Sequence, residues 1–353
     1  PQVDIDFNTD IGFAKYGAFF QASRSFAEDR LNFSFGLRTD MNSFTDTGNE
    51  FWRTLSPRLA LSYALSEKWY LNASAGRYFK LPIFTILGFR SEAGDLVNQD
   101  VDYTRSDHLV AGVEYAPKPS FRVTMEGFYK KYGNYLVSRR DGISLANQGG
   151  DFGAIGNEDV ASNGEGRSYG VELFLQQKLT KKTFASISYT LFWSEFTGID
   201  GNYIRSAWDS RHLLSAIVGR KLGRGWEIGI KYRLAGGAPY TPFDLQASQQ
   251  NYLSLGRGIL DYDRYNTLEL DLFQQLDLRV DKKWNLKGFT IDLFFDFTNA
   301  LLFPNPAYPN YTFERTEDNS GFATTDGEPI QADGENAVPL ILDNDDPTFT
   351  PTI

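Results

Sequence analysis

The sequence of 353 residues contains no cysteine and only two histidines, His108 and His212. Without thiols it has no disulfide framework and no cysteine-based zinc site. Two histidines so far apart in the sequence also give little support to a His-dependent nucleophile. An enzymatic function is therefore not expected, and we predict neither a metal site nor a cofactor.

The sequence also lacks any apolar run close to the roughly 18 residues that a membrane helix needs. Its mean hydropathy is −0.37, although 41% of its residues are hydrophobic. Helices and closed β-barrels are the only structures that span a bilayer, so any membrane crossing here must use β-strands. A barrel hides its hydrophobicity in alternation, and a low mean hydropathy is no objection to it.

Positive charge is in deficit, with 35 basic against 45 acidic residues and a net charge of −10. We find no basic patch interleaved with aromatic residues, so nucleic acid is not an expected partner. The chain begins PQVDIDF, which is not a signal peptide. If the protein is exported, we expect its N-terminal part to be missing from this sequence.

The strongest pattern lies between Thr267 and Leu301. Leucines at every second position from Leu268 to Leu278, interrupted at Gln274, face away from acidic and polar residues, and Phe289 to Phe297 alternate in the same way. A period of two predicts β-strands. Each arm reaches the 9 to 11 residues of a membrane strand, whereas soluble strands usually have about 5 or 6.

The same alternation recurs along the chain and predicts a series of hairpins. The expected strands lie near 16–22 and 31–37, 59–65 and 69–75, 109–115 and 121–129, 169–175 and 185–191, and 226–232. Residues 211–222 are apolar on both faces, so their sides cannot be assigned from the pattern.

The connections alternate between short and long. Short turns fall near 27–30, 66–68, 117–120, 179–182, 222–225 and 282–287, and long polar segments near 42–55, 82–104, 139–165, 197–209, 237–266 and from 302 onward. This sorting is typical of an all-β, antiparallel up-and-down outer-membrane barrel, and a soluble sandwich has no reason to adopt it. Trp69, Trp226 and Trp284 lie beside short turns, as an interfacial girdle would, although aromatic residues also favour strands in general.

Counting these strands gives twelve, and both chain ends then lie on the long-loop side. Natural barrels of this kind begin and end in the periplasm with an even number of strands. We therefore expect an odd number of strands to be missing at each end, and we expect the strands at 13–26 and 286–299 not to pair with each other.

Several phrases resemble the barrel of TonB-dependent outer-membrane transporters, especially the Bacteroidetes-type variety. They are LSPRLALSYAL with GRYFKLP (55–82), SYGVELFLQQKL with ISYTLFWSEF (168–196), DSRHLLSAIVG (209–219), GGAPYTP (236–242), and LDLRVDKKW with LFFDFTNAL (276–301). The resemblance implies a Gram-negative outer membrane location and a 22-stranded barrel with its lumen closed by an N-terminal plug.

On this resemblance, residues 1–353 form a single domain that supplies about twelve of the 22 strands. The plug, the TonB-contacting segment, the earlier strands and the last strand would lie outside it. The implied partners are outer-membrane lipid, the TonB complex through the missing N-terminal part, and a surface lipoprotein.

A membrane barrel fixes the two faces of each strand, because alternate side chains point outward and inward. We predict that the lumen side carries Lys231, Asp277, Arg279 and Asp292. The predicted lipid-facing residues are Leu268, Leu270, Leu272, Leu278, Phe289, Ile291, Leu293, Phe295, Ile228 and Ile230.

Ligand recognition is expected in the long loops 82–104, 139–165, 237–266 and 302–350. Arg139, Arg140, Tyr240 and Tyr252 are the predicted contacts, because planar and bidentate groups suit polar ligands; a solvated loop is the alternative for each of them. The acidic segment 314–346 offers oxygen ligands for Ca²⁺, but its spacing is not that of an EF-hand loop, and no metal site is predicted.

The function that this reasoning favours is active, TonB-dependent import of a scarce ligand across the outer membrane. A passive porin, or a structural or receptor subunit of a larger outer-membrane complex, would have the same wall. A plug domain encoded upstream would separate import from the porin. The sequence does not identify the ligand, since importers of siderophores, cobalamin, glycans and peptides share this type of wall.

Overall fold

The computed structural model describes residues 9–148 and 157–343 and divides them into two compact units. The wall unit consists of described residues up to Gly236 together with Phe273–Pro304. The loop unit consists of Gly237–Leu272 and the described residues from Asn305 to 343. Within the described residues, no helix is long and apolar enough to cross a membrane.

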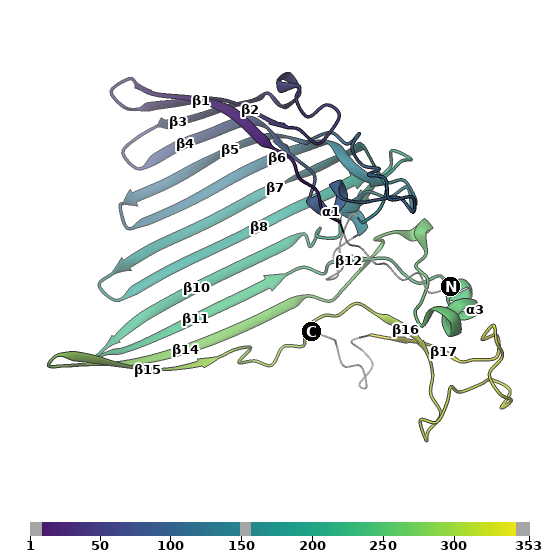
Figure 1. Cartoon of the computed structure of the whole chain (residues 1–353). Helices are drawn as coiled ribbons and strands as arrows, with labels where there is room; N and C mark the ends of the chain where they lie inside the picture. Colours follow the sequence, from purple (N-terminus) through teal and green to yellow (C-terminus); the bar gives the residue numbers. More distant parts are fainter. Residues whose placement is uncertain (1–8, 149–156, 344–353) are drawn as a thin grey trace. The chain divides into compact units, whose positions relative to one another are not determined.

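The wall unit is an antiparallel sheet in which each long strand pairs with its neighbours in the sequence (Figure 1). This up-and-down order confirms the predicted fold class. The strands along the sheet are β1 (Lys15–Phe26), β2 (Leu31–Asn42), β3 (Ser56–Ala64), β4 (Trp69–Lys80), β5 (Thr104–Lys118), β6 (Phe121–Ser138), β7 (Val160–Thr180), β8 (Thr183–Thr197), β10 (His212–Gly223), β11 (Trp226–Ala235), β14 (Phe273–Leu286) and β15 (Phe289–Phe297). A short strand, β9 (Tyr203–Arg205), pairs with β8 beside this path.

Short turns and long loops alternate along the wall, as predicted. The turn between β10 and β11 consists of Arg224 and Gly225, with φ of 51° and 79°. Two consecutive positive φ values suit a two-residue hairpin turn, whose twist matches that of its strands. A side chain at Gly225 would lie 2.0 Å from the carbonyl oxygen of Lys283, so this position also requires glycine for close packing.

The strand register gives the sheet one apolar and one polar face, because antiparallel partners lie on the same face. The apolar face carries Phe20, Phe35, Leu61, Leu71, Val113, Met125, Leu173, Ile187, Val218, Ile230, Leu278 and Phe297. The polar face carries Ser34, Ser62, Asn72, Glu126, Glu172, Ser188, Ser215, Arg233, Asp277 and Asp296.

The register also places the predicted side chains of β11, β14 and β15. Leu278, Phe289, Ile291, Leu293, Phe295, Ile228 and Ile230 share the apolar face. Lys231, Asp277, Arg279 and Asp292 share the polar face. The division into two sides is therefore as predicted, while the contact of the apolar side with lipid stays a prediction.

Charged residues on the polar face form ion pairs across the strands. Lys231 Nζ lies 3.7 Å from Asp277 Oδ2, and Lys283 Nζ lies 3.2 Å from Asp292 Oδ2. Arg279 lies 2.9 Å from Asp281 on its own strand. These contacts connect β11, β14 and β15, so the charges contribute to the wall itself.

Aromatic side chains border the apolar face at both ends of the strands. Near the short turns, Trp69 and Tyr115 are partners with ring centroids 4.6 Å apart. Near the long loops, Tyr169 stacks on Trp193 at 5.5 Å and lies 6.4 Å from Tyr129. Rings with an apolar body and a polar edge suit both boundaries of a membrane.

One strand prediction is wrong. The expected strand through Leu268, Leu270 and Leu272 is interrupted, and the wall strand β14 begins at Phe273. Leu268 instead lies in β13 (Leu268–Glu269), which pairs with β12 (Pro239–Tyr240), and the Leu270 N–H donates to the carbonyl of Ala238 at 3.0 Å. The backbone groups of this segment are thus satisfied within the loop unit, and alternation alone could not reveal which partner they use.

The unassigned stretch 211–222 forms β10, and its register resolves the ambiguity. Val218 pairs with Ile230 and Ala185 and lies on the apolar face, whereas Ser215 and Ile217 lie on the polar face. An isoleucine on the polar face explains why this stretch looked apolar on both sides.

Within the described residues, β1 pairs only with β2 and β15 pairs only with β14. The two predicted edge strands therefore do not pair with each other, as expected. Unpaired edges cannot remain in hydrocarbon, because each free N–H and C=O would lack a partner there.

The loop unit has its own small aromatic core. Tyr311 and Phe313 on β16 (Asn310–Phe313), which pairs with β17 (Pro339–Leu342), are buried with Ala337 against Phe243, Tyr252, Phe322 and Ile330. Helix α3 (Leu245–Leu255) packs nearby through Gln249, whose side-chain amide donates to the carbonyls of Gly334, Glu335 and Ala337. The long loops of this unit are therefore folded.

The apolar face provides the first prediction. Replacing Leu278 by Arg should lower the free energy of unfolding by about 2 to 4 kcal/mol if the position lies near the bilayer midplane, because the charge would enter hydrocarbon. The measurement is reversible urea unfolding of the complete protein in phospholipid vesicles. The matched control is Ser188→Arg, at an exposed site on the polar face; an equal loss in both variants would contradict the assignment of the faces.

Candidate functional site

The long loops of the wall unit fold together into one loop cluster. It comprises residues 43–55, 81–103, 139–148 with 157–159, and 198–211. Its buried core combines Leu81, Ile86, Leu87, Val101 and Tyr103 from one loop with Leu136, Leu145 and Val160 from the next strands and loop. Ile11, Phe13 and Phe44 pack against this core. The apolar residues of these loops thus bury each other, which holds the loops in one arrangement.

Asn98 connects two of these loops through its buried side chain. Its amide Nδ2 donates to the carbonyl of Ile86 and to that of Glu158, both at 2.8 Å. Its carbonyl Oδ1 accepts from the Val160 N–H at 3.1 Å. Because Asn98 is fully buried, each of these backbone groups would lose its partner if the side chain were removed.

Further contacts extend the cluster on both sides. The Asp46 N–H donates to the Gln99 carbonyl at 2.9 Å, and this hydrogen bond joins the first loop to the second. On the other side, helix α2 (Leu145–Gln148) contributes Asn147, whose amide donates to the Phe196 carbonyl at 3.1 Å. The Ala207 N–H also donates to the Ala146 carbonyl at 3.1 Å, so within the described residues each long loop of the wall unit is connected to the next.

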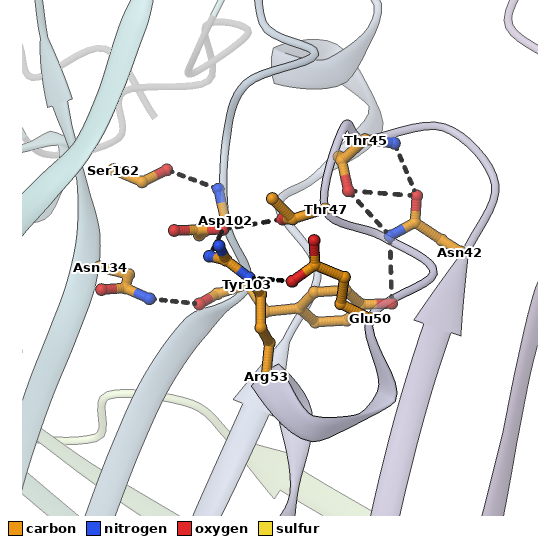
Figure 2. Close-up of polar contacts among 9 residues, drawn as sticks. All are labelled: Asn42, Thr45, Thr47, Glu50, Arg53, Asp102, Tyr103, Asn134 and Ser162. Atoms are coloured by element: carbon orange, nitrogen blue, oxygen red, sulfur yellow. Dashed lines mark hydrogen bonds and ion pairs between the residues drawn. The ribbon is translucent and has the colours of Figure 1, made fainter.

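A polar network lies beside this core, at the loop-side ends of β2, β6 and β7 (Figure 2). Asp102 is its centre: its Oδ1 accepts from Thr47 Oγ1 at 2.9 Å and from Arg53 Nη1 at 3.3 Å, and its N–H donates to Ser162 Oγ at 3.0 Å. Arg53 also donates to Glu50 Oε2 at 2.6 Å. This hydrogen bond, with the nearby Asp102 carboxylate, raises the pKa of the Arg53 guanidinium.

Asn42 and Tyr103 form the second half of the network. Asn42 Nδ2 donates to the Tyr103 hydroxyl at 3.3 Å and to Thr45 Oγ1 at 3.1 Å, and Asn134 Nδ2 donates to the Tyr103 carbonyl at 3.4 Å. Burial raises the pKa of the Tyr103 phenol. The hydroxyl therefore stays neutral at physiological pH and serves as a positioned hydrogen-bonding group.

The loop 198–211 is closed by a buried carboxylate. Asp209 is fully buried, and its Oδ2 accepts from Arg205 Nε at 3.0 Å and from Arg211 Nε at 3.3 Å. Burial raises the pKa of Asp209, while the two arginines act in the opposite direction. Two cations around one carboxylate give this loop a fixed conformation.

A cavity of about 580 Å³ opens at the loop-side ends of β1, β2 and β4, next to this cluster. Its volume lies within the range of small-molecule sites. Its lining includes Tyr16, Phe19, Phe79, Leu81 and Tyr103. Gly17 lines it as well, and a side chain there would meet the Thr39 carbonyl at 2.6 Å, so the close packing of β1 against β2 at this point requires glycine.

The cavity carries an excess of positive charge. Lys15, Arg38 and Lys80 line it, with Asp40 as the acidic residue. Arg38 is already engaged, since it forms two hydrogen bonds to the Asp40 carboxylate at 2.7 and 2.6 Å. Within the described part of the chain, neither Lys15 nor Lys80 forms an ion pair. Two exposed ammonium groups beside tyrosine and phenylalanine rings suit an anionic ligand with apolar parts.

The predicted ligand contacts Arg139 and Arg140 lie in the loop cluster. Arg139 forms ion pairs with Asp100 and Asp159, both at 3.0 Å, and Arg140 pairs with Asp141 at 2.7 Å. These partners hold the loop, so the two guanidinium groups contribute to its structure. Residues 149–156 of the predicted loop 139–165 lie outside the described residues.

Tyr240 and Tyr252 belong to the loop unit, whereas Arg139 and Arg140 belong to the wall unit. Tyr252 packs in the aromatic core, 4.7 Å from Phe313, and its hydroxyl contacts Thr312 Oγ1 at 2.9 Å. Tyr240 is half-buried in β12, and burial raises its pKa. The predicted loop 302–350 extends beyond the last described residue, Asp343.

Sequence reasoning missed the cavity lysines and several exposed apolar side chains of the loop cluster. Phe51 and Trp52 form a T-shaped pair at 5.2 Å and are more than half exposed, as are Phe84 and Ile199. The available signal in the sequence was the presence of aromatic residues in long loops, where they do not belong to the alternating pattern of a strand. Lys15 and Lys80 had none, because only the paired strands bring them to one cavity.

The two histidines do not form a catalytic arrangement. His108 Nε2 contacts Ser106 Oγ at 2.6 Å and its ring lies 4.7 Å from Tyr78, while His212 Nδ1 contacts the Tyr189 hydroxyl at 2.8 Å. Among the described residues no cluster of three His, Asp or Glu residues suits a metal ion. The acidic segment considered for Ca²⁺ continues to Asp345 and Asp346, which lie outside them.

Comparison with known proteins identifies the type of barrel. The family model described as TonB dependent receptor-like, beta-barrel matches residues 1–300. Among solved structures, the ferripyoverdine receptor of the outer membrane of Pseudomonas aeruginosa is similar, with 13% identity and a TM-score of 0.56 over 85% of this chain and 35% of that chain. The outer membrane transporter YddB from Escherichia coli has 11% identity and a TM-score of 0.56, over 85% and 42%.

The FrpB iron transporter from Neisseria meningitidis is also similar, with 16% identity and a TM-score of 0.51 over 77% of this chain and 38% of that chain. At these identities the likeness concerns the fold alone. The present chain spans 35% to 42% of the three solved chains. The Bacteroidetes-type resemblance stays a prediction.

The loop cluster provides the second prediction. Replacing Asn98 by Ala should lower the local opening free energy around Val160 by about 1 to 3 kcal/mol, because buried backbone groups lose their partners. Hydrogen exchange of the Val160 and Leu87 amides measures this opening. Asn202→Ala is the control, since Asn202 is exposed and bonds only to Asp200 in its own loop. Unchanged exchange in Asn98→Ala would show that Asn98 does not hold the loops together.

Proposed function

This chain belongs to the TonB-dependent receptor-like β-barrels of the Gram-negative outer membrane, and we propose that the whole protein imports a scarce ligand by TonB-dependent active transport. The energy would reach it through the TonB complex by way of a plug and an N-terminal segment of the whole protein. Further strands would close the wall between β1 and β15. A surface lipoprotein is a further partner under this proposal.

The observation that carries the proposal is the cavity with Lys15 and Lys80 beside the folded loop cluster. Ordering long loops costs conformational entropy, and hairpin closure alone needs only two to five residues. Here that cost is met by a buried core and by a network of buried hydrogen bonds. Loops ordered in this way can present a fixed site, as binding loops on rigid scaffolds do.

The charge of the cavity suggests the class of ligand. Lys15 and Lys80, which have no carboxylate partner within the described residues, would bind anionic oxygen atoms through charge-assisted hydrogen bonds. Phe19, Phe79 and Tyr16 would contact apolar or planar parts of the same ligand. Because solved relatives are described as a ferripyoverdine receptor and an iron transporter, anionic ferric chelates are the first compounds to test.

The third prediction concerns energy coupling. Cells that contain the complete protein should accumulate a radiolabelled ferric chelate only when TonB is present, because active import draws on the energised inner membrane. Uptake is compared in isogenic strains with and without TonB, using citrate, hydroxamate and catecholate chelates of ⁵⁵Fe. Equal uptake in the two strains would indicate a passive porin. Absence of uptake of every compound, together with a stable partner complex, would indicate a structural subunit.

The fourth prediction concerns the cavity. The double variant Lys15→Gln, Lys80→Gln should bind an anionic ferric chelate about tenfold or more weakly, since a hydrogen bond to a charged group contributes roughly 1.5 to 3 kcal/mol. Equilibrium binding to purified outer membranes measures this effect. The matched control is Lys68→Gln, Lys178→Gln, which removes the same charge near the short turns. A loss of affinity in the control equal to that in the cavity variant would reject the cavity as the binding site.

A further inference from the structure

Three adjacent hairpins of the wall carry a group of cations at their short turns. We define this basic rim as Lys181, Lys182, Arg220, Arg224, Lys282 and Lys287. Lys181 and Lys182 form the turn of β7 and β8, Arg220 and Arg224 lie at the turn of β10 and β11, and Lys282 and Lys287 lie at the turn of β14 and β15. β8 pairs with β10 and β11 pairs with β14, so the three turns are neighbours along one edge of the wall.

Cations of the basic rim have no acidic partners within the described residues. Five of the six side chains are exposed and Lys282 is half-buried, yet none forms an ion pair. Near these turns, Glu227, Asp281 and Asp292 lie on the polar face, and Asp281 forms an ion pair with Arg279 while Asp292 forms one with Lys283. An unpaired group of like charges repels itself, so an anionic partner would stabilise it.

The opposite, loop-side end of the wall shows a different arrangement. The strand positions that continue the apolar face there hold a row of cross-strand partners: Arg77, Asp107, Lys131, Arg167 and Glu195. Arg77 lies 2.6 Å from Asp107 and Arg167 lies 2.7 Å from Glu195. The cations of this row are thus neutralised by the chain itself. In a chain with a net charge of −10, a group of unpaired cations at the turns does not follow from a shortage of acidic residues.

Lys282 extends the basic rim from the turn onto the apolar face. It lies on the apolar face, as the register partner of Trp226 and Leu293. Its ammonium is 5.0 Å from the Trp226 ring and 5.3 Å from the Trp284 ring, and it donates to the Arg224 carbonyl. Trp residues prefer the boundary between headgroups and hydrocarbon. An ammonium between two such rings retains further N–H groups at the headgroup level.

Arg220 has the same placement on the neighbouring hairpin, since it pairs with Ile228 on the apolar face. A soluble acidic protein would meet the turns themselves, but it would not reach side chains on the face that contacts lipid. Lipid phosphate groups lie at the depth of the Trp rings and carry the complementary charge. Basic residues near an anionic leaflet are attracted to it over about a Debye length.

We propose that the basic rim binds the phosphate groups of anionic phospholipids in the leaflet on the short-turn side. This binding would fix the height of β7 to β15 in the membrane and select lipid at that edge of the wall. The proposal depends on the outer-membrane location of the barrel and is independent of the transported ligand.

The test uses the complete protein reconstituted in phosphatidylcholine vesicles with a trace of spin-labelled phosphatidylglycerol or spin-labelled phosphatidylcholine. Electron paramagnetic resonance of the motionally restricted fraction gives the preference for the anionic lipid. The rim variant is Lys181→Gln, Lys182→Gln, Arg220→Gln, Lys282→Gln. We expect its preference to fall by about fivefold or more, because each basic residue close to the surface contributes ~1 kcal/mol, a factor of about five, and we expect high salt to abolish the wild-type preference.

The matched control removes four loop-side cations, Arg77→Gln, Arg105→Gln, Lys131→Gln and Arg167→Gln, and should leave the lipid preference unchanged. An equal loss in both variants, or an unchanged preference in the rim variant, would overturn the proposal. Circular dichroism and the mobility of unheated samples verify folding, and the single variants Lys282→Gln and Arg220→Gln replace the quadruple variant if it does not fold. No TonB is present, so failure here leaves the import proposal intact.

Discussion

The structure of the wall depends on one constraint: every backbone N–H and C=O within the membrane must find a partner in a neighbouring strand. Register then becomes the quantity that positions side chains, because a slip of one residue would exchange the two faces of a strand. The chain uses this consistently. The register that pairs Leu278 with Ile230 and with Phe297 also pairs Asp277 with Lys231, so apolar contacts and ion pairs are fixed by the same hydrogen bonds.

The same constraint explains what could be predicted from the sequence. Alternation identified the strand pairs and the two sides of β11, β14 and β15, and the lengths of the connections identified the two rims. Alternation failed at Leu268, because the residues in the two-residue ladder between β12 and β13 alternate in the same way as those of a membrane strand. It gave no answer for β10, where Ile217 occupies the polar face. In both cases the missing information was the identity of the partner strand, which a single-strand pattern does not contain.

The loops and the contacts chosen in them stay a predicted binding region, and the structure shows that several of these residues also have structural partners. Arginine and tyrosine were selected because planar and bidentate groups suit polar ligands. The same groups also stabilise loops: Arg139 forms ion pairs with Asp100 and Asp159, and Tyr252 packs in an aromatic core. Lys15 and Lys80, which line the cavity, are 65 positions apart and come from β1 and β4. The register between distant strands assembles this cavity, so residue type alone is a poor guide to its lining.

The charges at the two ends of the wall follow from what each end must face. Near the loops, cross-strand ion pairs such as that of Arg167 with Glu195 neutralise part of the charge. Lys15 and Lys80 of the cavity form no ion pair within the described residues, and they are the groups that we propose to attract an anion. Near the turns, Lys283 and Asp292 form an ion pair on the polar face, whereas Lys282 and Arg220 lie on the apolar face and form no ion pair within the described residues. Because Lys282 and Arg220 face away from the carboxylates of the polar face, those carboxylates do not neutralise them. The sheet can then brace itself through ion pairs on one face, while the proposed binding of lipid phosphate would use the cations beside the tryptophans of the other face.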